Sequence, residues 1–165
     1  MQIRRATGEE MLKLWGYRDE TAAPSTAKFF YRSISTGNTE FWALDHCGEL
    51  IGELYVFRDI AEDRDFADGT TTAYLCAFRV KNGYRGRGLG SRLMETVLSN
   101  LNAEGFRRAT IGVSEERNER LYRRLGFTDT VKRCFVDPCA MDEKMRPERD
   151  DQGFWLLAKN LSTNR

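Results

Sequence analysis

The stretch Arg85-Gly86-Arg87-Gly88-Leu89-Gly90 decides the fold of this chain. It follows an apolar, strand-like run at residues 73–80 and opens a helix-like run at residues 91–101. Its alternate glycines allow backbone torsions and close approaches that a Cβ atom would forbid. The first amides of a helix have no internal partner and lie at the positive end of the helix dipole. The stretch therefore predicts a phosphate-binding turn between a strand and a helix.

Two common nucleotide-binding motifs do not fit this turn. A P-loop ends in Gly-Lys-Ser/Thr, and that triplet is missing here. A dinucleotide fingerprint has GxGxxG spacing near the first strand of its fold and an acidic residue about twenty residues later. Here the glycines Gly86, Gly88 and Gly90 alternate in mid-chain, and Arg107 and Arg108 lie near the place of the acidic residue. The remaining pattern is Arg-x-x-Gly-x-Gly ahead of an amphipathic helix.

The composition predicts one globular domain spanning residues 1–165. Hydrophobic residues make up 41% of the chain and charged residues 31%, which suits a packed core with a soluble surface. The 26 Lys and Arg residues nearly balance 25 Asp and Glu residues, so neither nucleic acid nor a membrane surface is an expected partner. Residues 1–10 lack the apolar core of a signal peptide, and no run approaches the roughly 18 apolar residues of a membrane helix. We expect a cytoplasmic protein.

The cysteines point to free thiols rather than to a metal site. Cys47, Cys76, Cys134 and Cys139 form no CxxC pair, and we expect no metal. Cys76 lies in an apolar run without a histidine nearby in sequence, so we do not expect an acyl-cysteine intermediate.

The periodicity of the chain predicts a mixed sheet with about four helices. A capping box, Thr7 with Glu10, begins the first helix, and Ser25 or Thr26 caps the second. The other helices follow the glycine turn and occupy residues 115–124. Short links between strand, helix and strand over residues 73–113 imply a right-handed crossover and a parallel pair. The expected strands are 2–6, 41–44, 49–57, 73–80, 109–113, 127–136 and 154–158.

One segment near the C-terminal end is expected to be irregular. Residues 137–152 are charged and contain Pro138 and Pro147. We therefore expect a long loop there, able to order over a ligand.

Two motifs together resemble the GNAT superfamily of N-acetyltransferases. The acetyl-CoA signature of that family, Gln/Arg-x-x-Gly-x-Gly/Ala, is matched by Arg85, Gly88 and Gly90. The segment Leu121-Tyr122-Arg123-Arg124-Leu125-Gly126-Phe127 is similar to the family's Leu-Tyr-x-x-x-Gly-Phe. The close resemblance covers about residues 74–127. It implies an α/β (α+β) GNAT fold, with a central mixed sheet of about six or seven strands and acetyl-CoA bound where the middle parallel strands splay.

The resemblance also implies which residues hold the cofactor. Residues 78–80 resemble the end of the family's fourth strand, whose main chain pairs with pantetheine, and the amides of the glycine turn would cradle the pyrophosphate. Many relatives have an asparagine seven residues before the tyrosine; here that residue is Glu115, so either Asn118 takes over the contact or the contact is lost. The expected cofactor-binding residues are Phe78, Val80, Arg85, Gly86, Arg87, Gly88, Leu89, Gly90, Ser91 and Asn118.

The implied reaction is direct transfer of the acetyl group of acetyl-CoA to a primary amine of a small molecule or peptide. Tyr122 matches the family tyrosine that protonates or positions the leaving thiolate; its alternative role is that of a core tyrosine under Gly126 and Phe127. A main-chain amide of the fourth strand would stabilise the oxyanion. Glu53 and Glu115 are candidate general bases, with ordered water as the alternative.

Several points stay open at this level. The acceptor is not identified, and a homodimer is neither implied nor excluded. An acidic stretch at residues 58–69 is either a solvated loop or a rim that attracts a cationic amine. The alternative function is a catalytically silent GNAT-like domain that binds acetyl-CoA as a sensor. An RNA-binding domain would need a basic face that the charge balance does not provide.

Overall fold

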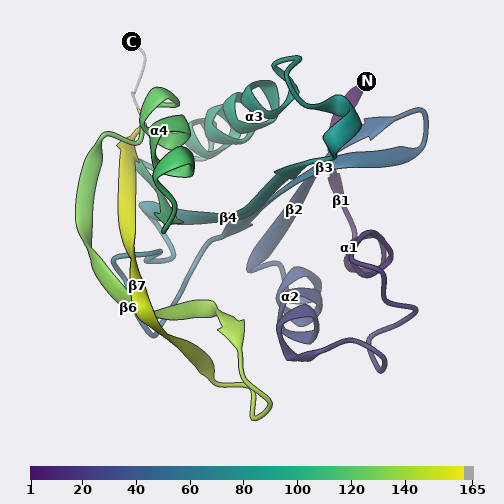
Figure 1. Ribbon diagram of the computed structural model, residues 1–165, viewed down its shortest axis with the longest axis horizontal. Coiled ribbons are helices and arrows are strands. Elements are labelled where there is room, and N and C mark those ends of the chain that lie inside the picture. The colour runs from purple at the N-terminus through teal and green to yellow at the C-terminus, as the bar shows by residue number, and fades with distance from the viewer. Residues whose placement is uncertain (162–165) are drawn as a thin grey trace.

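Seven strands form one mixed sheet in the computed structural model, which describes residues 1–161 (Figure 1). Within these residues four α-helices cover the sheet: α1 (Gly8–Leu14), α2 (Ser25–Thr36), α3 (Leu89–Ala103) and α4 (Glu116–Arg124). A short 3-10 helix, Asn82–Tyr84, follows the fourth strand. The strands are β1 (Gln2–Ala6), β2 (Thr39–His46), β3 (Glu49–Phe57), β4 (Thr72–Val80), β5 (Arg108–Val113), β6 (Asp129–Met141) and β7 (Pro147–Asn160). The predicted α/β architecture is confirmed, although the domain prediction extends to residue 165, beyond the described residues.

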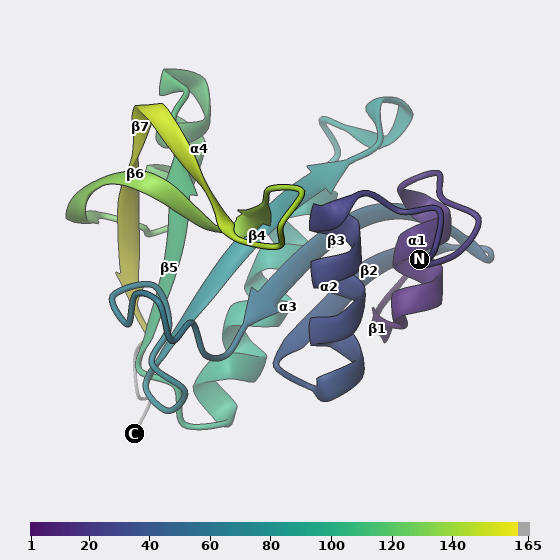
Figure 2. The ribbon, with the colours of Figure 1, turned by 90° about the horizontal axis from the view of Figure 1, so that it is seen from below.

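The sheet splits in its middle. Its strand order is β1-β2-β3-β4-β5-β7-β6, and β4 and β5 form the predicted parallel pair through α3. Their ladder ends at the pair Leu75 and Ile111, whereas β4 continues to Val80 and β5 to Val113. Beyond that pair β4 stays hydrogen-bonded to β3 and β5 to β7, so the two strands diverge (Figure 2). The gap opens at the carboxyl ends of both strands, where α3 and α4 begin.

The two faces of the sheet carry separate cores. Figure 1 shows α3 and α4 on one face and α1 and α2 on the other. On the first face α3 buries one stripe against the sheet, as its four-residue apolar spacing predicts: Leu89, Leu93, Met94, Val97, Leu98 and Leu101. On the second face aromatic rings of the sheet pack against α1 and α2, with Phe41, Tyr55 and Phe57 fully buried beside Phe30. Each such side chain contributes about 1.5–3 kcal/mol through burial.

The predicted loop at residues 137–152 is wrong, because this segment forms the turn end of the β6–β7 hairpin. β6 and β7 pair there, and Asp142 closes the turn by accepting hydrogen bonds from the amides of Lys144 and Arg146. The two prolines misled the prediction. Pro147 is the first residue of β7, and Pro138 falls where the β6 register shifts, so neither is required to donate to the ladder.

The cap of α2 also differs from the prediction. Its N-cap is Pro24, which makes no side-chain hydrogen bond. The hydroxyl of Thr26 instead accepts a hydrogen bond from the Met141 amide at 3.0 Å, which fastens the end of β6 to the start of α2. The capping box of α1 is confirmed, with Thr7 and Glu10 each accepting from the other's amide.

Candidate active site

A β-bulge in β4 decides which side chains reach each face of the sheet. One residue of β3, Leu54, opposes two residues of β4, Ala77 and Phe78. Ala77 has a φ of 51°, in the left-handed region that costs a residue with a Cβ atom about 1–2 kcal/mol. An extra residue in a strand moves the side chains after it to the opposite face. Phe78 and Val80 therefore join the core beneath α3, whereas Arg79 faces the α1–α2 side.

The glycine turn presents free amides at the start of α3. Gly86 and Gly88 have φ values of 79° and 75°, and Gly88 is the N-cap of the helix. The first helical hydrogen bond runs from the Arg92 amide to the Gly88 carbonyl, so the amides at positions 89–91 precede the bonded part of the helix. Arg85 donates from Nε to the Val80 carbonyl at 2.8 Å, which ties the turn to the end of β4. These amides lie at the positive end of a 15-residue helix.

A cavity of about 520 Å³ lies where the sheet splits, and we call it the α3–α4 cavity. It brings together all of the predicted cofactor and catalytic residues except Arg87. The guanidinium of Arg87 lies over the Tyr84 ring at 5.8 Å instead. The lining residues are Phe78, Arg79, Val80, Tyr84, Arg85, Gly86, Gly88, Leu89, Gly90, Ser91, Glu115, Arg117, Asn118, Leu121, Tyr122 and Leu125.

Gly90 lies against the wall of this cavity formed by β4. A Cβ atom at Gly90 would lie 3.1 Å from the ring of Phe78 and 3.5 Å from Val80. The 3.1 Å distance is shorter than nine in ten Cβ contacts in proteins, so a larger residue at position 90 would displace the Phe78 ring. The third glycine of the turn thus serves the close approach of α3 to β4 rather than a special torsion.

Tyr122 lies on α4 with its ring inside the α3–α4 cavity wall. It packs between Phe78 and Phe127, with ring centroids 6.4 Å away on each side. Within residues 1–161 its hydroxyl makes no hydrogen bond, so it is free to serve a ligand. Burial, and to a smaller extent the neighbouring Cys76 thiol, raises the pKa of the phenol to about 12. The group is a neutral donor at ordinary pH.

The start of α4 supplies polar groups to the same cavity. Asn118 and Glu115 both line it, together with the cation Arg117. Glu115 is the N-cap residue of α4, yet its side chain makes no capping hydrogen bond. Glu115, which stands where many relatives have an asparagine, and Asn118, which could take over the contact of that asparagine, therefore both face the cavity.

The comparisons with known proteins agree with this geometry. A model of the acetyltransferase (GNAT) family matches residues 5–127. The chain belongs to the GNAT family. No curated protein sequence matches the chain. None of the helices in residues 1–161 is long and apolar enough to cross a membrane.

Several solved structures share the GNAT fold with this chain. An aminoglycoside 6'-acetyltransferase type Ii is 16% identical, with a TM-score of 0.64 over 100% of both chains. An aminoglycoside 6'-N-acetyltransferase complexed with coenzyme A is 13% identical, with a TM-score of 0.64 over 100% of this chain and 99% of that one. A polyamine N-acetyltransferase of Drosophila melanogaster is 16% identical, with a TM-score of 0.63 over 97% and 99%. At sequence identities of 13–16%, the similarity to these structures establishes a shared fold.

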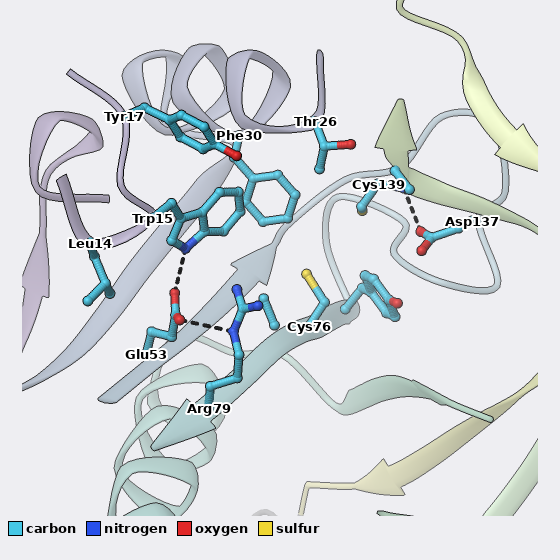
Figure 3. A pocket seen from close by; sticks show the side chains of 13 residues that line it. Leu14, Trp15, Tyr17, Thr26, Phe30, Glu53, Cys76, Arg79, Asp137 and Cys139 are labelled. Atoms are coloured by element: carbon cyan, nitrogen blue, oxygen red, sulfur yellow. Dashed lines mark hydrogen bonds and ion pairs between the residues drawn. The ribbon is translucent and has the colours of Figure 1, made fainter. Parts of the chain in front are cut away.

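A second cavity of this GNAT chain lies on the opposite face of β4, and we call it the α1–α2 cavity (Figure 3). Its volume is about 530 Å³. Arg79, near the end of β4, lines both cavities, so they lie on either side of this part of the strand. The lining residues are Leu14, Trp15, Tyr17, Thr26, Phe30, Glu53, Tyr74, Cys76, Ala77, Arg79, Asp137, Cys139 and Ala140.

Glu53, a predicted candidate base, lies in the α1–α2 cavity and is tightly held. Its Oε1 accepts hydrogen bonds from Trp15 Nε1 and the Tyr55 hydroxyl, both at 2.8 Å. Its Oε2 pairs with Arg79 Nε at 3.0 Å. Three donors occupy most of its acceptor sites, an arrangement that suits positioning better than proton abstraction. Glu53 and Glu115, the other candidate base, line different cavities.

Asp137 also lines the α1–α2 cavity, although its sequence context predicts only a charged loop. It is a half-buried carboxylate on β6, and its Oδ1 accepts a hydrogen bond from the Cys139 amide at 2.9 Å (Figure 3). Burial raises the pKa of this carboxyl, and the amides of Cys139 and Ala140 partly offset that rise. No local motif marks this residue; only the pairing of β6 with β7 brings it to the cavity.

The acidic stretch at residues 58–69 does not contribute to either cavity. Asp63 and Asp65 both pair with Lys132 of β6, at 2.6 and 3.0 Å. Asp68 accepts hydrogen bonds from the Thr71 hydroxyl and from the amides of residues 70–72. None of its five acidic residues lines the α3–α4 or the α1–α2 cavity. Of the two interpretations, the structure favours a surface loop, held by ion pairs with Lys132 and by hydrogen bonds from residues 70–72.

Proposed function

We propose that this protein is an acetyl-CoA-dependent N-acetyltransferase that acts on a primary amine. The observation that supports it best is the α3–α4 cavity, where the split sheet, the free amides of the glycine turn and Tyr122 line one space. Membership of the GNAT family and a structural neighbour complexed with coenzyme A support the same co-substrate.

Different residues of the α3–α4 cavity would hold different parts of acetyl-CoA. The pyrophosphate would lie against the amides at positions 89–91, with Arg85 and Arg117 as neighbouring cations. The pantetheine arm would follow the edge of β4 between Phe78 and Val80, because β5 has left that edge unpaired. The thioester would then lie beside the β4 bulge, between the two cavities.

The transfer step needs a donor for the oxyanion and a proton donor for the leaving thiolate at this point. The neutral amine nitrogen forms a bond to the thioester carbonyl carbon and gives up one proton to water, and the carbon–sulfur bond breaks. A main-chain amide of the bulge at Ala77 and Phe78 would stabilise the oxyanion in between. The Tyr122 hydroxyl, protonated because of its raised pKa, would give its proton or a hydrogen bond to the leaving thiolate. The acceptor would enter from the α1–α2 cavity on the other side of β4.

Release of free coenzyme A from acetyl-CoA in the presence of a panel of primary amines tests the proposal. We expect turnover with at least one amine, and a mass increase of one acetyl group on that amine. Tight binding of acetyl-CoA without turnover for any amine would contradict the enzyme and favour the silent sensor. Failure to bind acetyl-CoA would contradict both functions.

A further inference from the structure

The α1–α2 cavity contains one carboxylate whose charge is not compensated. Asp137 forms no ion pair with any cation of residues 1–161, and its contacts are the main-chain amides of Cys139 and Ala140. Glu53, the other carboxylate of the cavity, is neutralised by Arg79 at 3.0 Å. The charged lining residues therefore leave one net negative charge, at Asp137. A carboxylate that is partly withdrawn from water and has no counter-ion favours a cation bound beside it.

The rest of the cavity suits an aliphatic chain. Aromatic rings form much of its wall, and the thiols of Cys76 and Cys139 add small apolar surfaces. Ring faces also tolerate an ammonium group. Figure 3 shows Asp137 on one side of the cavity and the Glu53–Arg79 pair on the other, with this wall between them. The ring-bearing lining residues are Trp15, Tyr17, Phe30 and Tyr74.

We propose that Asp137 binds a second ammonium group of the acceptor, so that the preferred substrates are aliphatic amines with a positive charge beyond the reacting nitrogen. This inference rests on the proposed acetyl transfer. In it the reacting nitrogen lies beside the β4 bulge, where Ala77 lines the α1–α2 cavity and Phe78 the α3–α4 cavity, and the remote ammonium lies at Asp137. An acceptor with a carboxylate at the remote end would meet Asp137 with a like charge.

Three amines of equal length and different remote charge test the assignment: 1,5-diaminopentane, pentylamine and 5-aminopentanoate. We expect kcat/KM to fall in that order, by about 30-fold between the first two, which is a typical effect of removing one member of a buried charge pair. In Asp137→Asn the preference for the diamine should vanish, while kcat/KM for pentylamine stays within about twofold. The asparagine keeps an oxygen for the two amides, so the variant should fold and bind acetyl-CoA as the wild type does. Asp151→Asn, at a side chain 88% exposed on β7, is the matched control and should change nothing.

A second measurement separates this inference from acetyl transfer itself. Calorimetric titration of 1,5-diaminopentane into the protein with coenzyme A should show binding to the wild type and at least tenfold weaker binding to Asp137→Asn. If that difference is seen but no amine is acetylated, the enzyme proposal fails and the role of Asp137 stands. Two outcomes overturn the role of Asp137 and leave acetyl transfer intact. In one, kcat/KM for pentylamine equals that for the diamine in the wild type. In the other, Asp137→Asn lowers kcat/KM equally for all three amines. Absence of both diamine binding and diamine turnover overturns the role of Asp137 as well.

Discussion

Tyr122 is the residue whose environment says most about the chemistry. Its hydroxyl has no partner among residues 1–161, although the ring is buried between Phe78 and Phe127. A core tyrosine that served packing alone would need no hydroxyl at a cavity wall. The position of the Tyr122 hydroxyl oxygen thus supports the catalytic interpretation, and the sequence motif alone does not predict this position.

Replacing that hydroxyl gives the first prediction. Tyr122→Phe should lower kcat by about 10²-fold or more, because the leaving thiolate loses its proton donor. The free energy of unfolding and the affinity for acetyl-CoA should stay close to wild type, since the variant loses no hydrogen bond of the fold. Steady-state kinetics and a calorimetric titration measure the two effects. Unchanged turnover would remove Tyr122 from the mechanism and leave the cofactor site intact.

The raised pKa of Tyr122 gives a second prediction at the same scale. The phenol must be protonated to act as an acid, and its pKa of about 12 keeps it so through the alkaline range. Since the acceptor amine must lose a proton to attack, kcat/KM should rise with pH. It should show no decline near pH 10, where an ordinary tyrosine would ionise. A bell-shaped profile in wild type whose alkaline limb is absent in Tyr122→Phe would contradict the assigned environment.

The glycine turn is the element that connects backbone torsion with ligand binding. Gly88 has a φ of 75° as the N-cap of α3. Gly83, five residues earlier, has no positive φ, and no atom lies within 4 Å of the position that a Cβ atom would take there. The two positions therefore separate the effect of torsion from that of added bulk.

Gly88→Ala should reduce the free energy of unfolding by about 1–2 kcal/mol, the cost of a Cβ atom in the left-handed region. It should also weaken acetyl-CoA binding, because relief of the strain turns the amides at positions 89–91 away from the phosphate. Gly83→Ala is the control and should lower neither quantity. Urea unfolding and calorimetry measure both variants; equal effects from the two would show that the torsion of Gly88 is unimportant.

For the whole molecule, the β6–β7 hairpin joins elements that are far apart in sequence. Thr26 of α2 accepts from the Met141 amide, and Lys132 of β6 reaches Asp63 and Asp65 of the loop before β4. These contacts hold the hairpin over the α1–α2 cavity, far from the glycine turn. The two cavities are thus supported by different parts of the chain.

Thr26→Val tests that separation. Loss of the acceptor for the Met141 amide should lower the free energy of unfolding by about 1–2 kcal/mol. Because Thr26 and the hairpin residues Asp137 and Cys139 line the same cavity, KM for the acceptor should rise while acetyl-CoA affinity stays unchanged. Thr96→Val on the exposed side of α3 is the control and should leave KM for both substrates unaltered. A matching loss of acetyl-CoA affinity in Thr26→Val would argue against separate support of the cavities.

By itself the sequence determined the elements with a local cause. Alternate glycines before an apolar helix, a capping box and the Leu121–Phe127 motif depend on neighbours within a few residues, and they led to the sheet, α3 and most of the α3–α4 cavity. Only the tertiary structure decided the acceptor side. The bulge at Ala77 decides on which face of the sheet Arg79 lies. The shifted register between β6 and β7 accommodates Pro138 within β6. The same strand pairing brings Asp137 to the cavity that Glu53 also lines. The α1–α2 cavity thus draws its lining from residues more than 80 positions apart, such as Glu53 and Asp137. No local periodicity encodes this arrangement, because it exists only after the sheet has formed.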